Sequence, residues 1–339
     1  MRKLLCLVLT AALLCGCVPA SQEQKVYEAT FLELFDTVTA IRGRAESQEA
    51  FTQTAQHIRD QLERYHQLFD IYHDYPGLNS LKTVNDNAGI RPVQVDGAIL
   101  ALLKDCKSYY EVSGGLVNVA MGSVLSLWHD ARSSGIHDPT AAALPDASAL
   151  TAAAQHMDFS QVILDEENST VYLADPKMRL DVGAIAKGWS AQRVAEQAPQ
   201  GLLISVGGNI CATGPKTASG APWVVGVQSP DDPNTYVHTL YVSGGSVVTS
   251  GDYQRTYLVD GQLYHHIIDP ATLMPGRLWR SVTVICPDSA AADMLSTALF
   301  LLPQEAGQQL LEQFDAYALW IDAQGEQHYS PGFEKFIRT

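Results

Sequence analysis

The segment from Arg179 to Ser190 constrains this chain more than any other stretch of it. Apolar residues alternate up to Val182, as in a short strand, and Gly183 then breaks the pattern before a helical one begins. The first N–H groups of a helix lack intrahelical partners and carry partial positive charge, so they favour anions. Asp181 would end the strand, and Lys187 would add a cation one turn into the helix. The segment therefore predicts a strand-to-helix junction, either an ordinary turn with a surface lysine or part of an anion site, although the spacing of a Walker loop is absent.

The N-terminus has the pattern of an export signal. A basic start precedes an apolar run at 4–14, too short to span a membrane, and then Leu-Cys-Gly-Cys. This ending resembles the lipobox of bacterial lipoproteins, which implies a signal peptide over 1–16, a lipid on Cys17 and a polar tether over 17–24. We therefore expect an exported protein held at the cell membrane by its N-terminal lipid, on the extracytoplasmic face. A plain secretory signal cut nearby is the alternative.

The charge of the chain excludes some classes of partner. The formal net charge is −15, from 22 Lys and Arg against 37 Asp and Glu, which argues against nucleic acid and against a basic patch for anionic lipid. An anionic ligand would need a local device such as a helix start or a divalent cation. Beyond the export segment, Cys106, Cys211 and Cys286 have no metal-ligand or redox spacing and are expected to be buried thiols.

Helical and strand periodicities alternate from residue 25 to residue 339, with no linker that would divide the chain. Amphipathic helices are expected over 47–69, over 96–113 and after a cap at Asp288 or Ser289. The other expected elements are strands over 31–41, 201–206, 223–227, 244–251 and 281–286, a loop over 70–89, and hairpins turning at 166–169 and 260–261. We expect one mixed α/β domain with two interleaved subregions.

Two pairs of side chains in this domain could carry chemistry. Asp293 and Thr297 are four residues apart on the last predicted helix, so they project from one face. With a backbone carbonyl freed at the turn of 183–184 they would form an all-oxygen Mg²⁺ site, although such a pair is more often a surface face or a back-bonded hydroxyl. His265 and His266 are expected on the second strand of a hairpin, facing opposite ways, so that one is packed and the other faces the site.

Five motifs follow one another in an order that resembles a known family. They are Asp-Val-Gly-Ala-Ile-Ala-Lys-Gly at 181–188, Ile-Ser-Val-Gly-Gly-Asn-Ile at 204–210, Thr-Ser-Gly-Asp-Tyr at 249–253, His-Ile-Ile-Asp-Pro at 266–270, and Ala-Asp at 292–293 with Thr297. Together they resemble the ApbE-type FAD:protein FMN transferases over essentially the whole mature chain. The resemblance implies a mixed α/β domain at 25–339 with antiparallel-rich sheets, flanking helices and an FAD groove between two subregions.

The resemblance also implies a reaction. Enzymes of this family bind FAD and Mg²⁺, cleave the pyrophosphate, release AMP and esterify FMN through its phosphate to a Thr or Ser of an exported acceptor protein. Here the acceptor would be an electron-transfer subunit or an FMN-binding domain. A hydroxyl attacking a pyrophosphate needs charge neutralised on the transferring phosphoryl group and on the leaving group, which a metal ion and a lysine can supply. We therefore expect a transferase that flavinylates a protein covalently.

Carried onto this sequence, the family pattern implies a set of site residues. The implied metal ligands are Asp293, Thr297 and the backbone oxygen of Ala184. The implied FAD contacts are Phe35, Tyr72, Leu116, Val117, Asn118, Asp181, Lys187 and Ile268. His266 is the expected polar group near the reacting phosphates. The base that deprotonates the acceptor hydroxyl could be Asp252, His266 or Asp269, and the sequence does not choose among them.

Two positions depart from the family pattern. Residues 117–120 read Val-Asn-Val-Ala where Phe-Asp-Pro-Thr is common, so Asn118 keeps a hydrogen-bonding amide but lacks a carboxylate. Phe35 and Asp36 stand where Met-Gly or Met-Asp is usual. We expect this change to affect the packing of the isoalloxazine or adenine ring rather than the chemistry.

Two other functions fit the same residues. A Mg²⁺-dependent FAD pyrophosphatase would use water in place of the acceptor hydroxyl and give FMN and AMP. Nothing in this sequence separates it from a transferase, because the acceptor motif lies on the partner. A non-catalytic flavin-binding lipoprotein would have no need for Asp293, Thr297 and a freed carbonyl together, so their joint presence favours catalysis.

Overall fold

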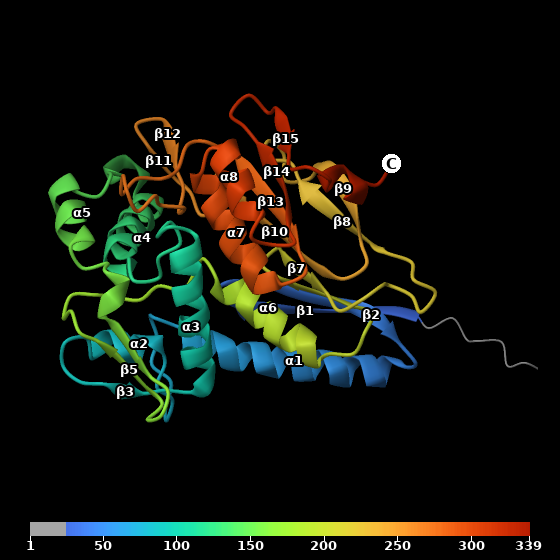
Figure 1. The fold of residues 1–339 in the computed structure, drawn as a ribbon, viewed down its shortest axis with the longest axis horizontal. Helices are drawn as coiled ribbons and strands as arrows, with labels where there is room; N and C mark the ends of the chain where they lie inside the picture. The colour runs from blue at the N-terminus through green and yellow to red at the C-terminus, as the bar shows by residue number, and fades with distance from the viewer. Residues whose placement is uncertain (1–24) are drawn as a thin grey trace, which may run out of the picture.

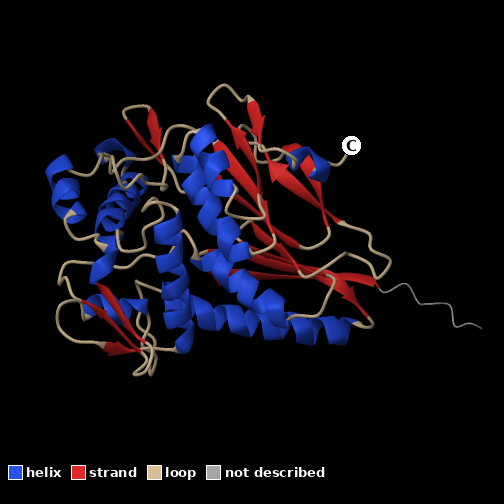
Figure 2. Ribbon diagram, viewed as in Figure 1, coloured by secondary structure: helices blue, strands red, loops and turns tan. Residues whose placement is uncertain are grey.

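The computed structural model describes residues 25–339, so the predicted signal peptide, the lipidation site at Cys17 and the tether lie outside the described residues. Its centre is an eight-stranded sheet in which every neighbouring pair is antiparallel (Figures 1 and 2). In spatial order its strands are β1 (Lys25–Leu34), β2 (Thr37–Ala45), β6 (Leu202–Val206), β7 (Asn209–Ala212), β10 (Gly245–Gly251), β13 (Ser281–Cys286), β14 (Tyr317–Ile321) and β15 (Gln327–Tyr329). The predicted mixed α/β fold with antiparallel sheets is confirmed.

The two faces of this sheet are covered by different layers. The helices on one face are α1 (Gln48–Phe69), α6 (Ala186–Gln197) and α7 (Ser289–Leu301), with α8 (Gln304–Leu311) packed against α7. The other face carries the hairpin of β8 (Trp223–Gln228) and β9 (Tyr236–Val242) and the 3-10 helix Phe333–Phe336. Strand alternation produces this division, since Val248 of β10 joins the helical core whereas its neighbour Val247 joins the opposite cluster.

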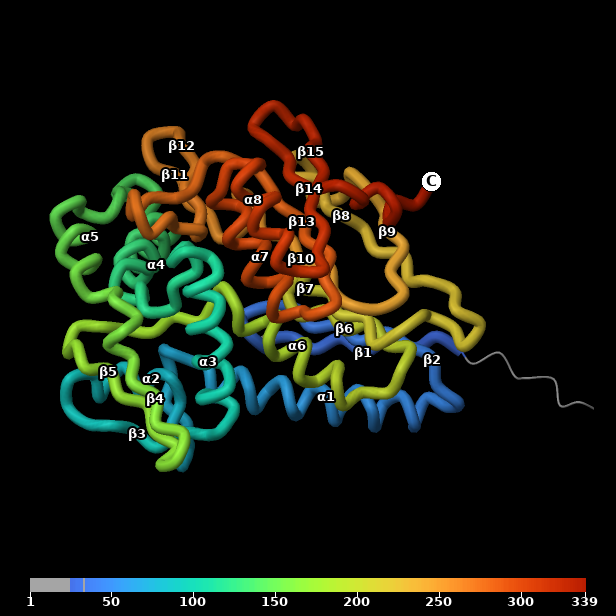
Figure 3. Tube along the Cα trace, viewed as in Figure 1, coloured from blue at the N-terminus to red at the C-terminus, as the bar shows by residue number. Residues whose placement is uncertain are grey.

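A second, smaller subregion lies beside these helices (Figure 3). Its helices are α2 (Leu81–Asp86), α3 (Gly97–Val112), α4 (Gly122–His137) and α5 (Ala147–Ala154), with short 3-10 helices at Pro139–Ala141 and Phe159–Gln161. Its strands are β3 (Val93–Gln94), β4 (Val162–Asp165) and β5 (Thr170–Leu173), together with the hairpin of β11 (Tyr257–Val259) and β12 (Gln262–Tyr264). Because β11 and β12 come from the C-terminal half yet pack on α4, the two subregions are interleaved.

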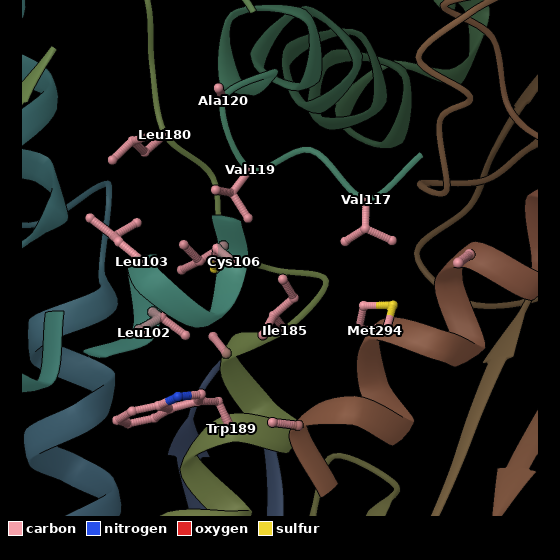
Figure 4. Packing of buried hydrophobic residues seen from close by; sticks show 14 of the residues in the cluster. Leu102, Leu103, Cys106, Val117, Val119, Ala120, Leu180, Ile185, Trp189 and Met294 are labelled. Atoms are coloured by element: carbon pink, nitrogen blue, oxygen red, sulfur yellow. The ribbon is translucent and has the colours of Figure 1, made fainter. Parts of the chain in front are cut away.

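The junction that precedes α6 is anchored by its apolar residues. Leu180 and Ile185 are fully buried and point into the same apolar cluster as Cys106, Trp189 and Met294 (Figure 4). Residues 178–182 do not form the predicted strand, because their ladder pairing is limited to one parallel bridge, between residues 179 and 121. Burial of these apolar side chains nevertheless fixes the position of the junction. Its polar side chains are then available to line a binding site.

The remaining thiols are structural. Cys106, Cys211 and Cys286 are buried and unpaired, as predicted, and burial raises the pKa of each thiol, to about 12 for Cys211 and about 11 for Cys286.

Within residues 25–339 no helix combines the length and apolarity needed to cross a bilayer.

Three helix starts that the sequence predicts are confirmed by their caps. The side chains of Ser47, Asp96 and Asp288 accept hydrogen bonds from the backbone N–H groups of Ala50, Ala98 and Ala291. Each bond satisfies a donor that has no partner inside the helix. The caps therefore fix where α1, α3 and α7 begin.

Three further local predictions are wrong. The strand predicted over 31–41 is a hairpin that turns at Phe35 and Asp36, which both adopt a φ of 54°. A two-residue turn of this kind needs positive φ at both positions, and neither residue is the glycine or asparagine that usually signals it. The loop predicted over 70–89 contains α2. His265 and His266 follow β12, which ends at Tyr264, so the rule of opposite strand faces does not apply to them.

The packing of α1 on the sheet gives a stability prediction. Ile58 is 1% exposed in the cluster between α1 and β2, whereas Ile90 is 71% exposed. We expect Ile58→Ala to lower the free energy of unfolding by about 2–5 kcal/mol, because it leaves a cavity. Ile90→Ala is the matched control and should change it by less than about 0.5 kcal/mol. Urea unfolding measures both, and equal losses would contradict the packing described.

Candidate active site

A cavity of about 450 Å³ lies between the two subregions, where the junction and the β1–β2 turn meet α4, α7 and the β11–β12 hairpin. It gathers most of the residues that the sequence predicts for a flavin and metal site. Those that line it are Tyr72, Leu116, Val117, Asn118, Asp181, Ala184, Lys187, His266, Ile268, Asp293 and Thr297. Residues that are far apart in the chain therefore meet at one place.

Three predicted site residues lie elsewhere. Phe35 lines an adjoining cavity of about 170 Å³. Asp252 follows β10, and its carboxylate lies 3.5 Å from the guanidinium Nε of Arg280. The Asp269 carboxylate accepts a hydrogen bond of 2.8 Å from the backbone N–H of Ala271. The structure thus places two of the three predicted bases outside the large cavity.

Gly188, in the first turn of α6, contacts α7 directly. Its N–H donates to Asp293 Oδ2 at 2.8 Å rather than to the carbonyl of Ala184, one turn earlier. The helices approach so closely that a Cβ on Gly188 would lie 2.3 Å from the carbonyl oxygen of Ser289 and 2.5 Å from Asp293 Cβ. Only glycine fits this contact, and the Ala184 carbonyl is left without that helical hydrogen bond.

Asp293, Thr297 and Ala184 bring three kinds of oxygen to the cavity wall. Asp293 is only 4% exposed, and burial raises the pKa of its carboxyl group, although Lys187 opposes this shift. Among residues 25–339 no cationic side chain lies within 4.0 Å of the Asp293 carboxylate. A buried carboxylate is costly without a partner. Carboxylate, hydroxyl and carbonyl oxygens are ligands that hard cations prefer, so these residues fit a divalent ion such as Mg²⁺.

The segment 116–121 forms another part of the cavity wall. Its Val119 carbonyl accepts a hydrogen bond of 2.8 Å from the N–H of Asp181, which ties it to the junction. Asn118 accepts from the N–H of Ala120 at 2.9 Å and donates to the carbonyl of Met157 at 2.9 Å. Each end of the amide therefore makes one hydrogen bond to the backbone and keeps a second donor or acceptor position, so Asn118 supports the wall while lining the cavity.

Tyr72 is held at the cavity by the loop after α1. The buried carboxylate of Asp70 organises this loop by accepting hydrogen bonds from the N–H of Tyr72, the N–H and ring of His73, and the hydroxyl of Tyr75. The Tyr72 ring stacks on His129 of α4, with 5.1 Å between ring centroids. Burial raises the pKa of Tyr72 to about 12, so its phenol stays protonated. An aromatic face is thus presented from a fixed position.

The two neighbouring histidines differ in their hydrogen bonds. His265 is 8% exposed, and its Nε2 donates to the carbonyl of Gly276 at 2.7 Å while its Nδ1 accepts from the N–H of Ile267. His266 donates from Nδ1 to the carbonyl of Gln254 at 3.2 Å. Because a carbonyl can only accept, this bond assigns the proton of neutral His266 to Nδ1 and leaves Nε2 as an acceptor.

The electrostatics of His266 give a pH prediction. Burial, together with the nearby charges of Arg255 and Lys187, lowers its pKa from 6.5 to about 3. Between these values the unfolded state binds a proton that the native state does not, so the free energy of unfolding falls as the pH is lowered through this range. We expect His266→Gln to weaken that dependence. Urea unfolding from pH 7 to pH 4 measures it, with His57→Gln, an exposed position on α1, as the control. Equal slopes for wild type and His266→Gln would contradict the assignment.

Comparison with known proteins places this geometry in a family. A family model described as the ApbE family matches residues 35–320. The chain belongs to the ApbE family. The resemblance carried by the five sequence motifs is therefore confirmed.

Curated relatives of this ApbE-family protein share a name. It is 36% identical over 280 residues to the FAD:protein FMN transferase of Treponema pallidum, an alignment that covers 77% of this chain and 75% of the relative. It is 35% identical over 260 residues to an FAD:protein FMN transferase of Klebsiella pneumoniae, covering 74% and 78%. These names confirm the predicted class of enzyme, a transferase.

Solved structures share the fold. The crystal structure of the ApbE protein from Thermotoga maritima has a TM-score of 0.81 to this chain at 28% identity, covering 93% of this chain and all of that one. The flavin transferase ApbE from Vibrio cholerae has a TM-score of 0.75 at 23% identity, covering 92% and 100%. The arrangement of sheet, helices and smaller subregion is thus that of the ApbE family.

Several cavity residues of this ApbE-family protein were not assigned to the site from the sequence, among them His129, Arg132 and Arg255. His129 and Arg132 lie on α4, and Arg255 follows β10. None stands in a short motif, and they come to one cavity only through the packing of α4 against the β11–β12 segment. Asn209 also lines the cavity, and the two glycines before it, at 207 and 208, are a sequence pattern typical of a place where something approaches the backbone closely.

Proposed function

We propose that this ApbE-family protein transfers the FMN moiety of FAD to a Thr or Ser hydroxyl of an exported acceptor protein and releases AMP. One observation carries the proposal: Asp293, Thr297 and the freed Ala184 carbonyl share a cavity with Lys187 and His266. In this proposal the three oxygens hold a metal cation, Lys187 adds a fixed positive charge and His266 acts as a neutral base, all at one cavity. The names of the curated relatives support the same activity.

The cation in this proposal is Mg²⁺, held by the carboxylate of Asp293, the hydroxyl of Thr297 and the carbonyl oxygen of Ala184. When bound, it would neutralise charge on the phosphate oxygens of the substrate. The Gly188 N–H fixes one carboxylate oxygen of Asp293 and leaves the other for a ligand. Lys187 adds a second positive charge, and its Nζ donates to the Gly183 carbonyl at 3.3 Å.

The chemical step requires a proton acceptor. A bond forms between the acceptor hydroxyl oxygen and the phosphorus of the FMN half, and the anhydride bond to AMP breaks, with its electron pair leaving on AMP. We assign the released proton to Nε2 of His266, whose Nδ1 is occupied by the Gln254 carbonyl. Asp252 and Asp269 are less suited, because neither lines the cavity. Binding of phosphate next to Lys187 and Arg255 would offset the charges that lower the pKa of His266.

The dinucleotide itself would lie along the remaining wall. Leu116, Val117 and Ile268 offer apolar surface, and Tyr72 offers an aromatic face on which a flat ring can stack. We propose Asp181 and Asn118 as polar contacts at this wall, and Phe35 as a contact from the adjoining cavity. The departure at Asn118 then alters the charge of the wall but not the route of the ligand.

The acceptor and the enzyme must meet on the same side of a membrane. We propose that residues 1–16 direct export, that Cys17 carries the lipid and that 17–24 tether the enzyme at the extracytoplasmic face of the cell membrane, as the lipobox-like ending implies. An exported electron-transfer subunit or FMN-binding domain is the partner this location suits.

The test combines the protein with FAD, Mg²⁺ and a candidate acceptor domain, followed by in-gel flavin fluorescence of the acceptor and chromatography of the nucleotides. We expect fluorescence that persists on the denatured acceptor and AMP in equal amount. Free FMN with AMP and no labelled acceptor, across a panel of acceptors, would identify a pyrophosphatase instead. FAD that stays intact but bound would identify a flavin-binding lipoprotein.

A further inference from the structure

Two arginines face the cavity with no counter-charge in contact. Arg132 of α4 and Arg255, after β10, both line it. Within residues 25–339 neither guanidinium lies within 4.0 Å of a carboxylate oxygen. Asp181 lines the same cavity, but its Oδ1 accepts from the N–H of Gly183 at 2.9 Å. The chain has a net charge of −15. Two arginines without a carboxylate partner therefore bring positive charge to this cavity on an otherwise acidic protein.

A hydrogen bond to His129 fixes the position of Arg132. Its Nη2 donates to Nδ1 of His129 at 3.3 Å, and His129 in turn stacks on Tyr72. Arg132 is half-buried, and burial together with the charge of Arg255 lowers the pKa of its guanidinium. Arg255 itself is exposed. The repulsion between a half-buried cation and a second cation near it costs energy, which a bound anion would offset.

The backbone of Arg255 adopts an energetically unfavourable conformation. Its φ is 46°, in the left-handed region that L side chains rarely adopt. Strain of this kind is typical of positions where the surrounding structure holds a side chain at a functional site. Here the strained residue is one of the two cations that face the cavity.

We propose that Arg132 and Arg255 form a clamp for a phosphate group of the flavin dinucleotide, separate from the cation site at Asp293. This inference rests on the proposed function, since it takes FAD as the ligand. Guanidinium groups suit phosphate because their donors match its oxygens in pairs. The phosphate belongs either to the AMP half or to the FMN half, and both present the same chemistry to the clamp.

The test measures what each phosphate contributes to binding. Calorimetry on the purified full chain, in EDTA, gives the ratio of affinities of AMP to adenosine and of FMN to riboflavin. We expect at least one ratio to be well above one in the wild type. Arg132→Ala or Arg255→Ala should lower that ratio by roughly ten- to a hundredfold, while the phosphate-free partner binds unchanged. The half whose ratio falls identifies the phosphate that the clamp holds.

Controls separate this result from misfolding and from failure of the proposed function. Arg59→Ala, an arginine of α1 outside the cavity, should leave both ratios unchanged, and Arg132→Lys should restore part of the loss. Both ratios near one in the wild type, or unchanged in both alanine variants, would overturn the clamp. The measurement needs no FMN transfer, so a protein that binds phosphate through these arginines but does not flavinylate an acceptor would refute only the proposed function.

Discussion

Replacing Asp293 by Asn is expected to lower FMN transfer by roughly a thousandfold or more, because it removes the only carboxylate of the proposed Mg²⁺ site. The substitution keeps the shape of the side chain and removes a buried charge. We therefore expect the folded state to be as stable as the wild type in EDTA, or more stable. Transfer is measured as flavin bound to the acceptor per unit time.

Thermal unfolding shows whether Asp293→Asn has lost only the cation site or also its fold. Mg²⁺ should raise the melting temperature of the wild type by binding the native state, and should not raise that of Asp293→Asn. Asp315→Asn, an exposed carboxylate, is the matched control and should keep both activity and the Mg²⁺ shift. A variant at Asp293 that transfers FMN at the wild-type rate would show that the cation site lies elsewhere.

Replacing Gly188 by Ala is expected to damage both the fold and the site. The new Cβ would lie 2.3 Å from the carbonyl oxygen of Ser289 and 2.5 Å from Asp293 Cβ, so α6 and α7 must separate. Overpacking of this kind costs about 1–3 kcal/mol of unfolding free energy. The hydrogen bond that orients Asp293 would also be lost. A shift of about 1 Å at a catalytic group can cost about a hundredfold in rate, and we expect a loss of that size.

The matched control for this helix contact is Gly97→Ala at the start of α3. A Cβ at Gly97 meets nothing within 4 Å. Alanine there should leave activity unchanged and should stabilise the protein by up to about 1 kcal/mol. Urea unfolding and the transfer assay measure both variants. If Gly188→Ala kept wild-type stability and rate, the close approach of α6 and α7 would not matter to the site.

Much of the candidate site could be predicted because its residues lie in short motifs. The junction at 181–188 and the pair at Asp293 and Thr297 are encoded by local spacing. The helix that carries the pair starts at the predicted cap Asp288, whereas α6 follows Ile185 without a side-chain cap. The fold that brings these two motifs together depends on the Gly188 contact between α6 and α7. That contact involves no local pattern, so the sequence could only suggest that the motifs meet.

The failures have the same physical origin. The turn at Phe35 and Asp36 is imposed by the pairing of β1 with β2, which overrides two residues that rarely adopt positive φ. The histidine at 266 faces the cavity from a segment beyond β12, which strand alternation could not describe. Arg132 and Arg255 come from distant segments and line one cavity only in the folded protein. Long-range packing, rather than local propensity, decides these features.

The most direct test of the proposed function is the intact mass of an acceptor domain after incubation with this protein, FAD and Mg²⁺. The account predicts a gain equal to one FMN less one water, on a Thr or Ser, that is lost in EDTA and with Asp293→Asn. An acceptor that FAD:protein FMN transferases of the curated relatives label, but that keeps its original mass with this protein, would contradict it.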